Sequence, residues 1–113
     1  MTEEINLLLE NVRTKKVQFA DVIAFIEDSY VHTPTAFRNG QATNAADQNQ
    51  GSAKVFAFAS LSNLSKEQTL SLFAEHYDAV LETPEGTDHQ NIRQFREHGW
   101  DGITFEGKAL QPK

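Results

Sequence analysis

Apolar residues recur at helical spacing over the first thirty positions. Positions 5, 8, 9 and 12 carry Ile, Leu, Leu and Val, which forms one apolar stripe on a helix that Thr2 is placed to cap. The same spacing continues from Phe19 to Tyr30 and predicts a second helix. That helix should end by Thr33, because Pro34 disfavours a helical conformation in the residue before it.

The middle of the chain predicts a helix that is buried on nearly all sides. Ser52 is placed to cap it, and the apolar residues of Val55–Leu61 point all round the helix axis. A strand is the competing interpretation, since Lys54–Ala59 partly alternates, but the length of the segment favours a helix. Ser65–Gln68 then reads as a capping box, which opens a fourth helix with an apolar stripe over Leu70–Leu81.

The C-terminal third predicts a short helix followed by strands. A second capping box at Thr87–Gln90 would open the helix, and Gly99 is suited to end it. Residues 103–106 alternate apolar and polar side chains, as in a strand. A turn at Glu106–Gly107 would bring residues 109–110 back to pair with that strand.

Together these patterns predict one α+β domain that spans residues 1–113. We expect a mainly helical fold of about five helices around one core, with a small antiparallel β-ribbon near the C-terminus at residues 102–111. A short strand at residues 35–38 is a further expectation. A chain of 113 residues suits one hydrophobic core and is too short for two.

Charge and composition limit the kinds of partner and the compartment that we expect for this protein. With 10 basic and 16 acidic residues, the net charge is −6, which repels phosphate backbones and argues against a nucleic-acid partner. No apolar run approaches the roughly 20 residues that a membrane span needs, so no membrane partner is expected. The chain starts with acidic rather than basic residues and has no long apolar stretch after them, so we expect a cytoplasmic protein.

The histidines and serines form no recognised catalytic or metal-binding motif. The chain has no cysteine, no HExxH and no G-x-S-x-G sequence. His89 and His98 are nine positions apart and so lie on opposite sides of one helix. Ser52 is better explained as an N-cap than as a nucleophile. We therefore expect no metal and no cofactor, and a role other than catalysis is favoured while the enzyme class stays open.

Polar residues beyond what the helices need gather in two segments, 32–54 and 83–93. Each segment leads into a predicted helix start, where backbone N–H groups and nearby cations favour a polar or anionic ligand. The candidate ligand-binding residues are His32, Asn39, Ser52, Lys54, Asp88, His89 and Arg93. The competing interpretation is structural: these side chains cap helices and close loops, with Arg93 paired to Asp88 or Glu97. A shared site requires both segments to lie on the same side of the molecule.

Five segments across nearly the whole chain form a recognisable set. They are Tyr30–Gly40, Gly51–Ala59, Thr69–Leu70 together with Phe73, Asp88–Phe95 and Gly99–Ile103. This set resembles the HopJ type III effector family. The resemblance implies a short, single-domain bacterial protein, and it brings no established activity, cofactor or catalytic residues.

We therefore expect a small acidic binding or interaction protein. Its partner would be an unidentified protein or a small polar or anionic ligand. The alternative is a small enzyme or a metal-dependent protein that uses the polar residues of segments 32–54 and 83–93. The resemblance also implies an alternative location, namely secretion by a type III system into a host cell.

Overall fold

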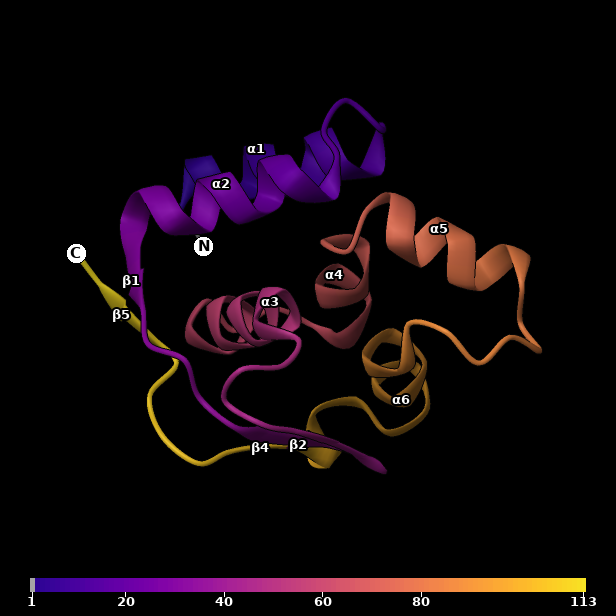
Figure 1. Cartoon of the computed structure of the whole chain (residues 1–113). Coiled ribbons are helices and arrows are strands. Elements are labelled where there is room, and N and C mark those ends of the chain that lie inside the picture. Colours follow the sequence, from indigo (N-terminus) through magenta and orange to yellow (C-terminus); the bar gives the residue numbers. More distant parts are fainter. Residues whose placement is uncertain (1) are drawn as a thin grey trace.

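The helix α3 (Gln50–Leu61) runs through the middle of the molecule, and the other elements pack around it (Figure 1). The computed structural model describes residues 2–113. Helices α1 (Glu3–Arg13) and α2 (Phe19–Ser29) lie on one side of α3, and helix α6 (Gln90–His98) and a small sheet lie on the other.

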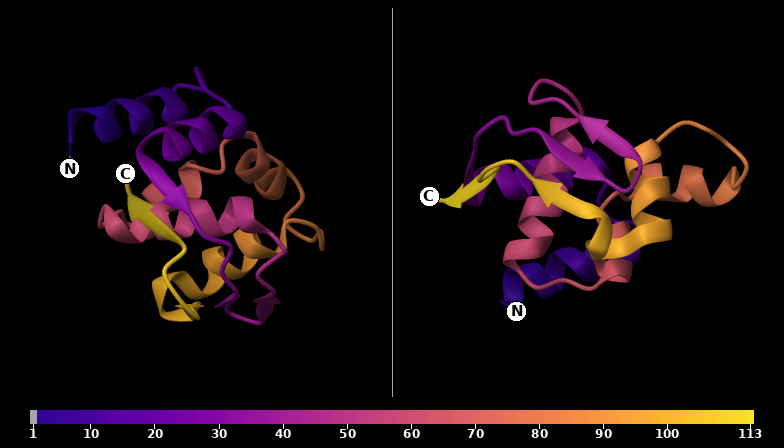
Figure 2. Two further views of the ribbon diagram at one scale, coloured as in Figure 1. Left: turned by 60° about the vertical axis from the view of Figure 1, so that its left-hand side comes forward. Right: turned by 90° about the horizontal axis from the view of Figure 1, so that it is seen from below.

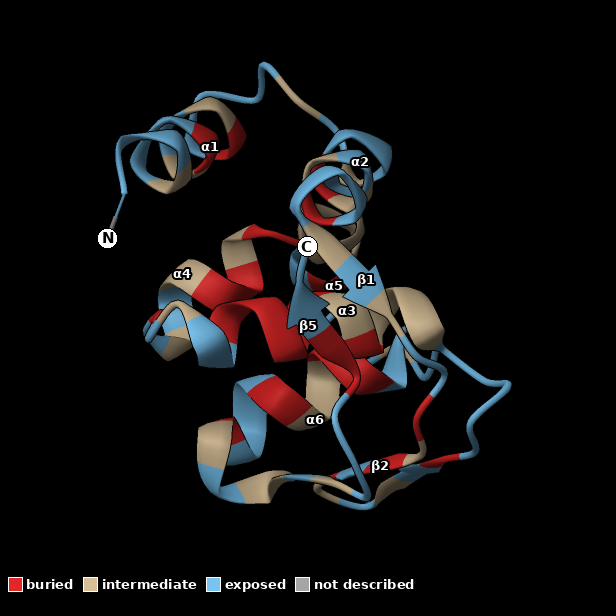
Figure 3. Ribbon diagram, turned by 90° about the vertical axis from the view of Figure 1, so that its left-hand side faces the viewer, coloured by how far each residue is buried: buried red, intermediate tan, exposed pale blue. Residues whose placement is uncertain are grey.

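The core is built around α3, as the colouring by burial shows (Figure 3). Six of its residues are buried: Ala53, Val55, Phe56, Ala57, Phe58 and Ala59. The ring of Phe56 has its centroid 4.9 Å from that of Phe95 and 5.4 Å from that of Phe73. The predicted helix with apolar residues on nearly all sides is confirmed, and the strand alternative is wrong. A helix satisfies its own backbone hydrogen bonds and can therefore be surrounded by apolar side chains.

Within residues 2–113, five short strands form two antiparallel sheets. Strand β1 (Tyr30–His32) pairs with β5 (Leu110–Pro112). Strand β2 (Phe37–Asn39) lies between β3 (Ala42–Asn44) and β4 (Ile103–Phe105). Seen from below, β2 and β4 lie side by side (Figure 2). The predicted α+β class, with small antiparallel strands at the C-terminus, is confirmed.

The two C-terminal strands pair with distant segments rather than with each other. Phe105 of β4 lies opposite Phe37 of β2, and Leu110 of β5 lies opposite His32 of β1. The expected turn at Glu106–Gly107 therefore does not fold residues 109–110 back onto β4. An isolated hairpin of two short strands is marginally stable, whereas these pairings tie both strands to segments that pack on the helices.

The helix predicted after Ser65 is in fact two helices, α4 (Lys66–Ser71) and α5 (Glu75–Glu82). The capping box is present, with Ser65 Oγ accepting from the N–H of Gln68 and Gln68 Oε1 accepting from the N–H of Ser65. Ala74 interrupts the helix, with φ of 52° and ψ of −123°. Those angles lie outside the helical region, so the chain changes direction at this residue.

Two predicted N-caps are wrong. Helix α3 begins directly after Asn49, so Ser52 lies inside its first turn, and α6 begins directly after His89 rather than after Thr87. Both residues that precede these helices have a left-handed backbone, with φ of 50°. The Asn49 amide donates instead to Asn44 Oδ1 at 2.7 Å, so a contact outside the helix decides where α3 begins.

Other predicted helix boundaries are confirmed. Thr2 Oγ1 accepts from the N–H of Ile5 at 3.3 Å, α2 ends at Ser29 before Thr33, and Gly99 ends α6 with φ of 64°. In residues 2–113, no helix is both long enough and apolar enough to cross a bilayer.

Candidate functional site

The two polar segments singled out by the sequence border one pocket of about 770 Å³. Residues 42–52 supply one side of its lining and residues 89–92 supply another. Phe19, Phe73 and His76 complete the lining. A pocket of this volume is of the size that holds small-molecule ligands.

Asparagine side chains form a hydrogen-bonded network at one wall of the pocket. Asn39 Nδ2 donates to the carbonyl oxygen of Asn91 at 2.7 Å and to its Oδ1 at 3.0 Å. Asn91 Nδ2 and Asn49 Nδ2 both donate to Asn44 Oδ1, at 3.0 and 2.7 Å. Asn44, Asn49 and Asn91 line the pocket, while Asn39 is fully buried behind it. Each amide is held by a neighbour, so the wall presents its polar groups in fixed orientations.

Aromatic rings form another part of the pocket lining. Phe19 stacks on Phe73 with ring centroids 5.8 Å apart, and its ring also lies edge-on to His76 at 4.9 Å. The ring of His76 lies 5.2 Å from that of His89. The N–H of Phe19 donates to Glu75 Oε1 at 2.7 Å, which ties the start of α2 to the start of α5. This part of the lining therefore combines the apolar rings of Phe19 and Phe73 with the imidazoles of His76 and His89.

Two helices begin at the pocket without a side-chain cap. Neither Asn49 before α3 nor His89 before α6 makes a capping hydrogen bond with its side chain. Gly51 and Ser52, in the first turn of α3, line the pocket together with Gln90, the first residue of α6. The first N–H groups of a helix lack partners within it and carry the positive end of its dipole. Both helix starts therefore favour hydrogen-bond acceptors in the pocket.

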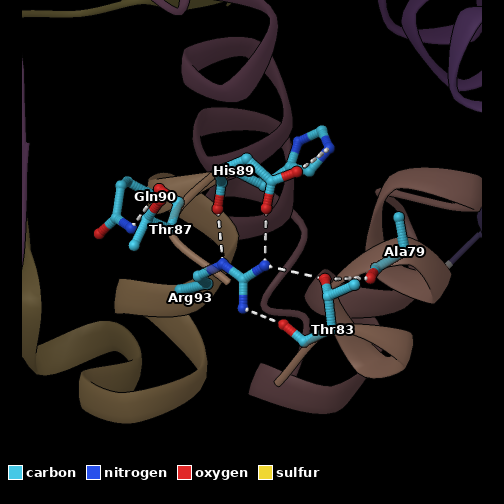
Figure 4. Close-up of polar contacts among 7 residues, drawn as sticks. Ala79, Thr83, Thr87, His89, Gln90 and Arg93 are labelled. Carbon is cyan, nitrogen blue, oxygen red and sulfur yellow. Dashed lines mark hydrogen bonds and ion pairs between the residues drawn. The ribbon is translucent and has the colours of Figure 1, made fainter. Parts of the chain in front are cut away.

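Arg93 closes the loop that precedes α6 (Figure 4). Its guanidinium donates to the carbonyl oxygen of Thr83 at 2.7 Å and to Asp88 Oδ1 at 2.7 Å. The Arg93 side chain is only 11% exposed, and its hydrogen bond to Asp88 lowers the pKa of that carboxyl group. The structure shows the Arg93–Asp88 pair of the structural interpretation, and neither residue lines the pocket.

Three of the seven candidate residues belong to the pocket or support it. Ser52 and His89 line it. Asn39 does not line it but holds Asn91, which does. Parts of both polar segments therefore border one pocket, which is the arrangement that a shared site would require.

His32 and Lys54 have contacts elsewhere. The Nε2 atom of His32 lies 3.1 Å from Oε1 of Gln50, and that oxygen also accepts from the N–H of Thr35. Lys54 Nζ lies 2.8 Å from a carboxylate oxygen of Glu27, and this hydrogen bond lowers the pKa of the Glu27 carboxyl. Both candidates thus connect neighbouring segments and do not line the pocket.

Several lining residues were not among the candidates. Those with aromatic, imidazole or amide side chains are Phe19, Asn44, Gln48, Asn49, Phe73, His76, Gln90 and Asn91. The amides lie inside or beside the two polar segments, so the density of Asn and Gln was a usable signal. Phe19, Phe73 and His76 lie on predicted amphipathic helices, where periodicity alone does not separate a pocket wall from the core.

In the part of the chain that the structure describes, no group of three or more His, Asp or Glu residues is placed to hold a metal ion. The chemistry that the pocket offers is hydrogen bonding from amides, imidazoles and backbone N–H groups, and stacking on aromatic rings.

The fold and the site define a small α+β protein with a polar pocket between two helix starts. The chain belongs to the HopJ type III effector protein family, whose profile matches residues 5–110. The crystal structure of the unknown-function protein VPA0580 matches with a TM-score of 0.89 and 46% sequence identity. That match covers 100% of this chain and 97% of the other. A comparison with curated proteins found no match.

Proposed function

We propose that this protein binds a small polar ligand in the pocket between residues 42–52 and 89–92. The observation that carries the proposal is the convergence of the two polar segments on one pocket of about 770 Å³. Fixed amides on one wall would set the orientation of the ligand, and the rings of Phe19 and Phe73 would cover its less polar part. The role proposed is recognition rather than catalysis.

The alternative, a small enzyme, has one observation in its favour. Ser52 and His89 line the same pocket, and a serine beside an imidazole is a known nucleophile and base combination. No hydrogen bond joins these two side chains in residues 2–113, and the imidazole of His89 faces His76 instead. Binding is therefore the better supported function.

The test uses a substitution that fills the pocket. A Cβ built on Gly51 meets the ring of Phe19 at 3.6 Å, which is ordinary contact, so Gly51→Leu should fold with its side chain in the pocket. The matched control is Ser60→Leu, at an exposed position of the same helix. Helix propensity rises in both variants.

A panel of small polar compounds is titrated into 15N-labelled protein, and the side-chain amide signals of Asn44, Asn49 and Asn91 are followed by NMR. We expect a subset of compounds to shift these signals in the native protein and in Ser60→Leu, and to lose at least about tenfold in affinity in Gly51→Leu. Shifts that survive Gly51→Leu unchanged would place binding elsewhere and overturn the proposal. Turnover of a bound compound, lost in Ser52→Ala, would favour the enzyme instead.

We also propose that the protein acts in the cytoplasm. Leu8 and Val12 of α1 are buried in the hydrophobic core, so this segment forms part of the folded protein. A fusion of residues 1–25 to a reporter should not be exported by a type III system. Efficient translocation of that fusion would support delivery to a host cell.

A further inference from the structure

His76 and His89 form a pair of facing imidazoles inside the pocket. His76 lies in the first turn of α5 and His89 lies directly before α6, so two different segments bring the rings together. Their centroids are 5.2 Å apart, with 34° between the ring planes, and both residues line the pocket. A protonated imidazole is a cation that donates from both of its ring nitrogens, so this pair can offer positively charged donors to an anion in the pocket.

The surroundings of the pair differ in charge from the rest of the protein. The chain carries 16 acidic residues and a net charge of −6, yet none of the 14 lining residues is Asp, Glu, Lys or Arg. Glu75 precedes His76 and Asp88 precedes His89 in the sequence. Glu75 accepts from the N–H of Phe19, and Asp88 is held by Arg93. Segment 42–52 and α2 add no charged side chain to the lining.

Protonation of one imidazole makes this pocket positive, and protonation of both brings two like charges close together. An anion that lies beside both rings, in the pocket that they line, offsets that repulsion, because each ring is then paired with negative charge. The Asp88 carboxylate has its Oδ2 3.9 Å from Nε2 of His89, while its Oδ1 pairs with Arg93. Its negative charge therefore compensates only part of a positive charge on His89. The uncapped starts of α3 and α6 add donors to the same pocket.

From this arrangement we propose that His76 and His89 together bind an anionic oxygen group, a carboxylate or a phosphate, and that binding takes up a proton. The inference rests on the proposed ligand pocket and names the class of its ligand. It makes affinity depend on pH: an anionic ligand binds more tightly as the pH falls through the range in which imidazole gains its proton.

The test uses sulfate as the probe, because sulfate keeps the same charge over the whole pH range of the experiment. Its affinity is measured by calorimetry at about pH 6 and about pH 8, in two buffers of different ionisation enthalpy and at constant ionic strength. The variants are His76→Gln and His89→Asn, the latter chosen because asparagine tolerates the left-handed backbone of residue 89. The control is His98→Gln, at an exposed histidine outside the pocket.

We expect sulfate to bind at least about fivefold more tightly at the lower pH in the native protein and in His98→Gln, with proton uptake from the buffer. Both pocket variants should lose the pH dependence and the proton uptake. Equal affinity in all four proteins would show adsorption to the surface and overturn the inference.

The same samples separate this inference from the proposed function. If neutral compounds shift the pocket amides and sulfate does not bind, the ligand is not an anion and only the inference fails. If neither neutral compounds nor sulfate perturb the pocket, both fail. Circular dichroism spectra identical to that of the native protein would confirm that each variant is folded.

Discussion

Asn39 and Asn91 are joined by two hydrogen bonds although they are 52 positions apart in the sequence. Asn39 lies in β2 and Asn91 in the first turn of α6, so this contact fixes the sheet against the helix that borders the pocket. Asn39 is fully buried, and its own Oδ1 has no partner within residues 2–113. The contact is therefore maintained by the amide donor alone.

We predict that Asn39→Ala lowers the free energy of unfolding by about 1–3 kcal/mol, because it removes both buried hydrogen bonds to Asn91 and leaves a cavity in place of the amide. Urea denaturation followed by fluorescence of Trp100 measures the change. Asn6→Ala is the control, since Asn6 is exposed on α1 and alanine is a better helix former. An Asn39→Ala protein as stable as the control would show that the buried network adds nothing to stability.

A second prediction compares the stability effects of two serines, Ser65, which caps a helix, and Ser52, which does not. Ser65 accepts from the N–H of Gln68 at 3.1 Å, so Ser65→Ala should cost about 1 kcal/mol. Ser52 lies inside the first turn of α3, and its replacement by alanine should change stability by less than about 0.5 kcal/mol. The same denaturation experiment tests both variants. A larger loss for Ser52→Ala than for Ser65→Ala would contradict the observed start of α3.

The loop closed by Arg93 should respond to pH. The hydrogen bond from Arg93 lowers the pKa of the Asp88 carboxyl in the folded protein below its unfolded value. A lowered carboxyl pKa means that the stabilising contact is present above the unfolded value, about 3.9 for Asp, and is lost as the pH falls through the folded value. We predict that amide hydrogen exchange over residues 83–89, corrected for its intrinsic pH dependence, speeds up in that acidic range.

The same loop gives a matched pair of variants at neutral pH. Arg93→Lys cannot reproduce the contacts that one guanidinium makes with both Thr83 and Asp88, so residues 83–89 should exchange faster while α3 is unaffected. Arg96→Lys, at an exposed position of the same helix, is the control. Identical exchange in the two variants would mean that Arg93 does not hold the loop.

The sequence predicted those parts of the fold in which local pattern and tertiary environment agree. The helix α3 is an example, because apolar residues on all sides leave a central position as the only stable one. The capping box at Ser65 is another, since all of its groups lie within four residues. The excess of polar residues before two helices also singled out the segments that border the pocket, but the sequence did not show whether those segments meet.

The rest depended on contacts between distant residues. Local rules favoured Ser52 and Thr87 as N-caps, but Asn49 and His89 precede the helices, and Asn49 bonds to Asn44. The helical spacing of apolar residues also gave no indication of the break at Ala74. Such a stripe shows which face of a helix is buried, but it carries no information about the backbone angle φ. His76 was missed as a pocket residue for a related reason: it lies two residues after the break, and periodicity does not show how α5 is oriented relative to α4.

The break at Ala74 leads to a prediction in which substitution by glycine has opposite effects on stability at two nearby positions. Ala74 has φ of 52° and ψ of −123°, a region that is strained for any residue with a Cβ and open to glycine. Ala74→Gly should therefore stabilise the protein by about 1 kcal/mol, because relief of strain exceeds the loss of one methyl group. Ala79→Gly, in the interior of α5, should destabilise it by about 1 kcal/mol.

Thermal and urea denaturation of the two variants measure these shifts, and compounds that bind the pocket should retain their affinity in Ala74→Gly. That outcome is expected because glycine adopts the backbone angles of residue 74 without moving α5, and His76 keeps its place beside Phe19. Destabilisation by both glycines would mean that residue 74 does not have a positive φ. The direction of α5, and with it the position of His76 in the pocket, would then have another origin.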